Sequence, residues 1–271
     1  MRFYLFLNPN PLYLHPEMAT LNDKTLGIVL STIPVNDHWQ FVHIYTKEMG
    51  RITCRIPQHT RGKQASQMRN LLAPLTLLDL VLADLKGSAP HAGTAEKILQ
   101  IKEVQLISSP YLLTMSHPDK ASQCLYMAEL IDHTVREIEP NPYLWQFLTG
   151  SMEILENLEE DWANFHLVFT NGLTRQLGFS IDPDQYQPGY LLDLKEGLFT
   201  PGPIHHPIYL NAESAKWYHR LLRLDYGTLG SLPLNRQQRA ALLDMELAFL
   251  NQHIPEMGTL RSIDVVKSLF E

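Results

Sequence analysis

Three stretches near the start of the chain decide the fold: TLGIVLSTIP at residues 25–34, WQFVHIYTKEMGRITCRIP at 39–57 and QHTRGKQASQMR at 58–69. The first two alternate apolar and polar residues and are rich in β-branched and aromatic side chains, which is typical of strands. The third has no acidic residue and completes a basic cluster of Arg51, Arg55, Arg61, Lys63 and Arg69. The whole chain has a net charge of −7, so this local reversal of sign favours contact with phosphate groups.

Five strand-like runs succeed one another in the first half of the chain. They are LGIVLSTI, FVHIYT, GRITCRI, LTLLDLVLADL and KILQIKEVQLI. Five short strands within about ninety residues are typical of a small closed barrel of the OB type, which leaves no sheet edge exposed. The loop between Gln58 and Leu72 joins two of the strands, and we expect a helical turn through ASQMRNLL at residues 65–72.

From Pro110 onward the apolar pattern changes to the period of helices. We expect helices over SQCLYMAELIDHTVREIEP, PYLWQFLTGSMEILENLEE, DWANFHLVFTNGLTRQLGF, AESAKWYHRLLRL, RQQRAALLDMELAFLNQHI and IDVVKSLF. The first of these should bury one stripe, formed by Cys124, Leu125, Ala128, Ile131 and Val135. The predicted helix caps are Ser122, Asn211, Asn235 and Ser262, and the predicted stops are Pro140 and Gly178.

The expected fold class is α+β, with an N-terminal OB-type small β-barrel followed by an α-helical C-terminal domain with a short β-hairpin insertion. The hairpin is predicted by YLLDLKEGLFTPG at residues 190–202. Charge divides the chain in the same way, because residues 18–107 hold ten Lys/Arg and seven Asp/Glu, whereas residues 108–271 hold eleven and twenty-one. We therefore expect a nucleic-acid-binding domain at 18–107 and a partner-interaction domain at 108–271. Residues 1–17 look like an accessory or disordered leader, with Met18 as a candidate natural start.

Several classes of protein are disfavoured by the sequence. Two cysteines, Cys54 and Cys124, are too few for a disulfide framework and lack metal-site spacing, so we expect two small buried side chains in a cytoplasmic protein. No apolar run approaches the ~18–20 residues of a membrane helix, so we expect a soluble protein without a membrane partner. The pair His205-His206 with His219 does not have zinc spacing. Acidic residues between 156 and 161 are interpreted as a solvated face. We expect no catalytic residue, metal or cofactor.

Alternation along one strand places four ring side chains on a single face. These are Trp39, Phe41, His43 and Tyr45, while Val42 and Ile44 fall on the other face. Such rings could stack on unpaired bases, at ~1–3 kcal/mol each. They could also pack against neighbouring parts of the protein, and we favour that interpretation because small barrels need aromatic residues at their contacts.

In this order and spacing, the segments of the chain resemble the bacterial RecO family of recombination mediators. The resemblance begins near Lys24 and is carried by KTLGIVLSTIPVND, VHIYTKEMGRI, TRGKQASQMRNLLAPLTLLDL, YMAELIDHTVREIEPNPYLWQFL and ANFHLVFTNGLTRQLGF. It implies a protein without catalytic turnover that binds single- and double-stranded DNA and anneals complementary strands. It also implies that the protein works with RecR to load recombinase onto DNA covered by single-stranded DNA-binding protein. The resemblance further implies that the protein recognises the acidic, Phe-terminated tail of that binding protein.

The resemblance implies DNA contacts at Lys24, Arg51, Arg61 and Lys63, and the basic cluster adds Arg55 and Arg69. The tail would need an apolar pocket with cations on the helical half, for which Arg136, Arg175, Arg220 and Arg223 are candidates. Many relatives carry a four-cysteine zinc site after the helix that ends in LGF. Here residues 182–206 contain no cysteine, so we expect apolar packing through Tyr190, Leu192 and Phe199 in its place.

Our leading interpretation is a non-enzymatic, nucleoid-associated mediator of recombinational DNA repair. Two alternatives remain open at this stage. One is an OB-fold adapter that binds acidic peptides or RNA, and the other is a metal-dependent hydrolase built on the histidines and carboxylates.

Overall fold

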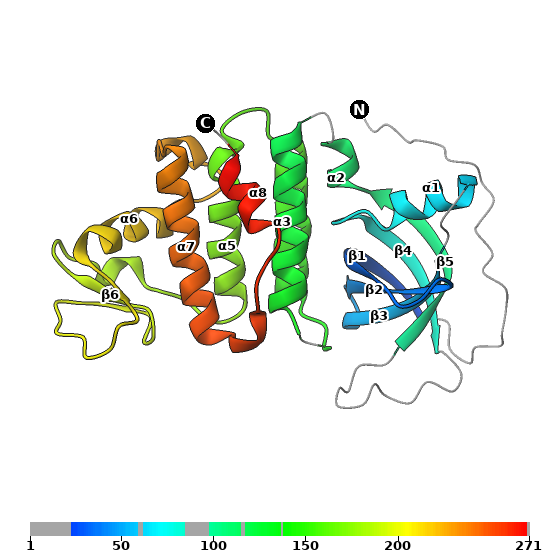
Figure 1. The fold of residues 1–271 in the computed structure, drawn as a ribbon, viewed down its shortest axis with the longest axis horizontal. Coiled ribbons are helices and arrows are strands. Elements are labelled where there is room, and N and C mark those ends of the chain that lie inside the picture. The colour runs from blue at the N-terminus through cyan, green and yellow to red at the C-terminus, as the bar shows by residue number, and fades with distance from the viewer. Residues whose placement is uncertain (1–22, 59–61, 85–97, 115–116, 137, 270–271) are drawn as a thin grey trace. The chain divides into compact units, whose positions relative to one another are not determined.

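The structure is a computed structural model that describes residues 23–58, 62–84, 98–114, 117–136 and 138–269 (Figure 1). The chain divides into two compact units. The first comprises Met1–Ser109 with Glu137–Pro140, and the second comprises Pro110–Arg136 with Asn141–Glu271. The predicted leader at residues 1–17 and the basic loop residue Arg61 lie outside the described residues.

The first unit is a closed barrel in the order β1-β2-β3-β5-β4 (Figure 1). Its strands are β1 (Asp23–Pro34), β2 (Trp39–Thr46), β3 (Gly50–Pro57), β4 (Leu77–Asp84) and β5 (Ile98–Ser108). Neighbouring strands are antiparallel except β3 and β5, which run parallel. The predicted OB-type barrel is thus confirmed. Helix α1 (Gly62–Leu71) between β3 and β4 confirms the expected helical turn and starts three residues earlier than predicted.

The barrel interior is filled by the apolar side chains that alternation assigned to it. Val42 and Ile44 from β2 and Cys54 from β3 are completely buried there, and Met68 from α1 joins the same cluster. Gly27 is constrained by this packing. A Cβ atom at that position would lie 2.6 Å from Ile44 Cγ2, so even alanine would force the core to shift.

The second unit is mainly helical. Its helices are α2 (Pro110–Leu113), α3 (Pro118–Thr134), α4 (Pro142–Asn157), α5 (Phe165–Gln176), α6 (Ala212–Leu222), α7 (Arg236–His253) and α8 (Ile263–Ser268). All six predicted helices are present, together with the short α2. Helix α5 lies between α3 and α7 (Figure 1) and is buried at every residue from 165 to 174, including the polar residues His166, Thr170, Asn171 and Thr174.

Three of the predicted helix ends are confirmed by hydrogen bonds or backbone geometry. The side chain of Asn211 accepts a hydrogen bond from Ser214 N at 2.9 Å, and Asn235 forms a capping box with Gln238. Gly178 follows α5 with a φ of 87°, a left-handed conformation that glycine adopts without strain. These local signals depend on one turn of backbone only, so the sequence was sufficient to locate them.

Predicted details of helix α3 are wrong, and the cap predicted for helix α8 is confirmed in position only. Helix α3 begins at Pro118, four residues before the predicted cap Ser122, whose hydroxyl donates to the Pro118 carbonyl inside the helix. Helix α3 ends at Thr134, well before Pro140. Leu125 is 37% exposed and therefore lies outside the buried stripe. Ser262 is the N-cap residue of α8, as predicted, but its side chain makes no capping hydrogen bond, because its hydroxyl donates at 2.5 Å to the carboxylate of Glu129.

The predicted hairpin is confirmed as β6 (Leu191–Asp193) with β7 (Leu198–Thr200). A third strand, β8 (Tyr209–Leu210), pairs with β6 and was missed because two residues give no periodic signal. Leu192 and Phe199 pack against α6 and α7, with Tyr190 at the margin of the cluster, as predicted. Asp193 Oδ1 accepts hydrogen bonds from the backbone of Lys195 and Glu196, at 2.9 and 3.0 Å.

Candidate functional site

Cations predicted to bind an anionic ligand are spread over several elements of the barrel unit. Lys24 on β1 has a side chain 72% exposed, and its Nζ lies 3.3 Å from Asp79 on the neighbouring strand β4. Arg69 is exposed in the last turn of α1. Lys63 occupies the second residue of the same helix. Lys63 and Arg69 therefore lie on the helix that connects β3 to β4, whereas Lys24 lies on β1.

The outer face of β2 and β3 carries the other two predicted cations. The register pairs Tyr45 with Arg51 and Phe41 with Arg55, so each arginine stands beside an aromatic ring on the outside of the barrel. Arg51 is only 6% exposed, and its Nη2 lies 2.9 Å from His43 Nδ1. Little of Arg51 is accessible and its contact with His43 supports this face, so its predicted contact with DNA stays a prediction.

Arg55 has a different environment from Arg51. It is half-buried, and its guanidinium carbon lies 4.5 Å from the ring centre of Trp39, a cation–π contact. Trp39 itself remains 36% exposed. The sequence grouped the two arginines together, whereas the structure separates a buried supporting residue from an accessible one.

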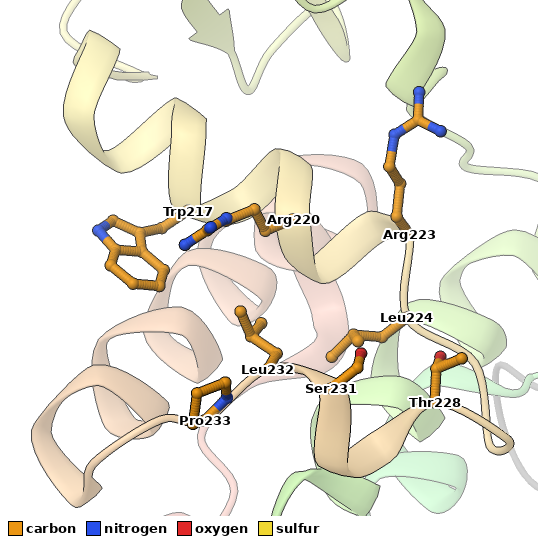
Figure 2. A pocket seen from close by; sticks show the side chains of 8 residues that line it. All are labelled: Trp217, Arg220, Arg223, Leu224, Thr228, Ser231, Leu232 and Pro233. Carbon is orange, nitrogen blue, oxygen red and sulfur yellow. The ribbon is translucent and has the colours of Figure 1, made fainter.

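A pocket of about 380 Å³ lies in the helical unit (Figure 2). Helix α6 forms one wall, and the 3-10 turn η3 (Leu229–Ser231) with the residues around it forms the other. The lining combines apolar and polar side chains: Trp217, Arg220, Arg223, Leu224, Thr228, Ser231, Leu232 and Pro233. Such a mixture can accept an apolar group at its centre and an anionic group at its edge.

Two of the predicted partner-binding cations meet at this pocket. Figure 2 shows Arg220 beside Trp217, with its guanidinium carbon 5.1 Å from the indole ring centre. Arg223 points away from Trp217, and its Nη2 lies 2.6 Å from Asp184 Oδ1. Arg136 and Arg175 do not line the pocket. Arg220 is therefore the best placed of the four predicted cations to meet an anionic group in this pocket.

The η3 wall is held in place by residues that precede it by about seventy positions in the chain. The buried side chain of Asn164 donates hydrogen bonds to the carbonyls of Leu229 and Leu232, at 2.9 and 2.8 Å. A Cβ atom at Gly230 would lie too close to Asp161 Oδ2, so a side chain there would have to displace that carboxylate. Asn164 was not predicted from the sequence, although a polar residue at the edge of the largely apolar run FHLVF is a signal for a buried hydrogen bond.

Two observations concern nucleophilic and metal-dependent chemistry, and a third concerns membrane insertion. Burial raises the pKa of the Cys124 thiol to about 12, which keeps it protonated and unreactive at neutral pH. Within the described ranges, no three His, Cys, Asp or Glu side chains gather into a potential metal site. No helix in those ranges has the length and apolar character needed to cross a bilayer.

Comparisons with known proteins point to the same family for both units of the chain. The chain matches the family model described as Recombination protein O N terminal at residues 18–91, and Recombination protein O C terminal at residues 115–185. It is similar to the DNA repair protein RecO of Bacteroides fragilis, with 31% identity over 249 residues that cover 92% of this chain and 99% of the relative. The proteins of the same name from Phocaeicola vulgatus and Porphyromonas gingivalis are 29% and 27% identical, over 91% and 90% of this chain and 98% of each relative.

Proposed function

The chain belongs to the RecO family of DNA repair proteins, and we propose that it acts in recombinational repair as a non-enzymatic, DNA-binding mediator. In this proposal it binds single- and double-stranded DNA and anneals complementary strands. Together with RecR, it helps to load recombinase onto single-stranded DNA covered by its binding protein, in the cytoplasm at the nucleoid. The observation that carries the proposal is a closed OB-type barrel whose sequence contains a basic cluster at residues 51–69, in a chain whose net charge is −7.

Electrostatic attraction to the phosphate backbone supplies the binding energy in this proposal. Lys24, Arg61, Lys63 and Arg69 are the proposed phosphate contacts, and Arg55 is a proposed DNA contact beside Trp39. Each contact releases a condensed counterion from the DNA, and the gain in entropy is lost as the salt concentration rises. The helical half carries an excess of acidic residues, so DNA is directed to the barrel and away from the surfaces that meet proteins.

We predict a steep salt dependence for DNA binding. Three to five phosphate contacts on a single strand should weaken the affinity by about 20- to 100-fold between about 50 mM and about 200 mM salt. The measurement is fluorescence anisotropy with a labelled oligonucleotide at several salt concentrations. Equal affinities at the two concentrations would contradict the proposal, and tight binding of RNA with no binding of DNA would favour the adapter.

We further propose that the pocket beside α6 receives the acidic, Phe-terminated tail of single-stranded DNA-binding protein. Trp217, Leu224 and Leu232 offer apolar surface for the phenyl ring, and Arg220 offers a partner for the terminal carboxylate. A charge-assisted contact of this kind is stronger than one between neutral groups. This arrangement matches the combination of apolar pocket and cation that tail recognition requires.

Substitution of Arg220 by alanine should weaken the binding of a synthetic acidic peptide that ends in Phe by roughly tenfold or more, because a charge-assisted bond is lost. Isothermal titration calorimetry measures the effect. The matched control is Arg136→Ala, which removes an exposed arginine that does not line the pocket. A peptide with an amidated C-terminus should bind the wild-type protein weakly and lose little more in Arg220→Ala. Equal losses for both variants would place the tail elsewhere.

A further inference from the structure

We propose that one end of the outer barrel face is a stacking platform that selects unpaired bases. The platform consists of Ile33, Trp39, Phe41 and Arg55, at the end of the face where β1 turns into β2. The proposal rests on the DNA-binding function above and adds to it a basis for discriminating single strands from duplexes. The sequence pattern places four ring side chains on this face of β2, and the structure gives them different environments.

Accessibility changes along the same face of strand β2. Tyr45 is completely buried, Phe41 and His43 are half-buried, and Trp39 is 36% exposed. The sequence favoured packing of these rings against other parts of the protein. This interpretation holds for Tyr45 but not for Trp39. On the adjoining strand β1, Ile33 pairs with Phe41 and is 45% exposed. These residues leave an apolar, aromatic surface open to solvent at this end of the barrel.

The ring of Trp39 is held in place before any ligand binds. The side chain of Asn36 accepts hydrogen bonds from the backbone of His38 and Trp39, at 2.9 and 3.0 Å, and so fixes the turn. The Val35 backbone donates to the Trp39 carbonyl at 3.0 Å. The Arg55 guanidinium covers the indole with its carbon 4.5 Å from the ring centre. A restrained ring loses little conformational entropy on binding, which favours stacking with a ligand.

Charge indicates that the occupant is a nucleic acid base and not an acidic peptide. The turn beside Trp39 carries an exposed Asp37, which repels carboxylates and phosphates alike. Contact at this end is therefore through an uncharged group, while the cations on and around α1 bind the phosphates. Arg55 can add a second planar surface, because guanidinium groups stack on bases as well as on indoles.

Stacking distinguishes the two forms of DNA by geometry. In a duplex the faces of each base are covered by neighbouring base pairs, whereas an unpaired strand can turn a face outward. A base held by its face keeps its hydrogen-bonding edge free, so a complementary strand can still pair with it. The platform thus explains how a protein can hold one strand firmly and yet leave it able to anneal.

The direct test compares a thymidine oligonucleotide with an abasic strand of the same length and phosphate count. Wild-type protein should bind the abasic strand roughly tenfold more weakly, because base–aromatic stacking contributes ~1–3 kcal/mol per base. Trp39→Ala should bind the thymidine strand as weakly as wild-type protein binds the abasic strand, with no further loss on the abasic strand, and Trp39→Phe should keep most of the difference. Affinity for duplex DNA should change by less than about twofold in either variant.

Tyr143→Ala is the matched control, because it removes a ring that is 79% exposed on the helical unit. It should retain the preference for the thymidine strand. If wild-type protein bound abasic and thymidine strands equally, the platform would be wrong while the phosphate-based function stood. Equal losses on single strands and duplexes in Trp39→Ala would also overturn it. Absence of binding to any DNA would refute the proposed function itself, and the wild-type comparison needs no variant to fold.

Discussion

Reversing the charges of Arg61 and Lys63 to glutamate should lower the affinity for single-stranded DNA by about a hundredfold or more at low salt. The double variant removes two proposed phosphate contacts and adds two groups that repel phosphate. The net charge of residues 18–107 would fall from +3 to −1, so the long-range attraction of the barrel half for DNA would be lost as well. Fluorescence anisotropy with the labelled oligonucleotide measures both the affinity and its dependence on salt.

The salt dependence provides a signature that misfolding would not produce. Loss of two contacts should reduce the slope of log K against log salt by about 1.4, whereas damage to the fold would remove binding at every salt concentration. The control is Lys195→Glu with Lys216→Glu, which makes the same change of charge at exposed residues of the helical unit. If this control lost as much affinity as the test variant, net charge and not the location of the cations would govern binding.

Structural features that depend only on residues close together in the chain could be predicted from the sequence. The alternation that buries Val42 and Ile44 specifies which face of β2 enters the barrel, and Asn211 and Asn235 mark helix starts because a cap needs only one turn of backbone. For the same reason, Gly178 marks the end of α5. Five strands and six helices followed from such local rules, and so did the fold class.

Accessibility along an element was not predictable, because it depends on what packs on each residue from distant parts of the chain. Trp39 and Tyr45 share one face and one pattern, yet one is exposed and the other is buried. Arg51 and Arg55 are alike in composition and spacing, and only the structure separates the buried residue from the accessible one. Sequence patterns assign a side chain to a face, but they do not say which part of that face remains open.

The pocket shows the same limit at longer range. Its walls come from α6 and from the η3 region, and Asn164 fixes the second wall from another part of the chain. Arg220 and Arg223 were chosen from the sequence by residue type alone. Arg223 is paired with Asp184, 39 positions earlier in the chain, and periodicity gives no information about such a contact.

A buried carboxyl group in the helical unit limits stability at neutral pH. Glu246 on α7 is only 2% exposed, and neither of its carboxyl oxygens has a hydrogen-bond partner among the described residues. Burial raises the pKa of Glu246 well above its ordinary value of 4.5. Burial, and after it the nearby Glu246, raises the pKa values of Tyr126 and Tyr218, while burial and Arg239 lower the pKa of His166 to about 3. Tyr126, Tyr218 and His166 therefore stay uncharged between roughly pH 5 and pH 8. Among these four buried side chains, Glu246 is the one whose protonation changes with pH.

Replacement of Glu246 by glutamine should raise the free energy of unfolding at pH 7 by about 1–3 kcal/mol. The folded state holds a proton that the unfolded chain releases above pH 4.5, so Glu246 makes wild-type stability fall as the pH rises. The maximum slope of this loss is about 1.4 kcal/mol per pH unit, and it ends above the folded-state pKa. Urea unfolding at several pH values measures the free energy for both proteins.

The difference between the two proteins should follow the titration of this one group. It should be smallest near pH 4.5, where the carboxyl group is protonated in much of the unfolded ensemble, and should grow toward neutral pH. Glu153→Gln is the control, because it makes the same chemical change at an exposed residue of α4 and should leave the pH profile unchanged. Parallel profiles for wild type and Glu246→Gln would show that Glu246 is ionised in the folded state, with solvent or a structural change compensating its charge. A protein stabilised in this way should keep its DNA affinity, because Glu246 belongs to the helical unit and the proposed phosphate contacts belong to the barrel unit.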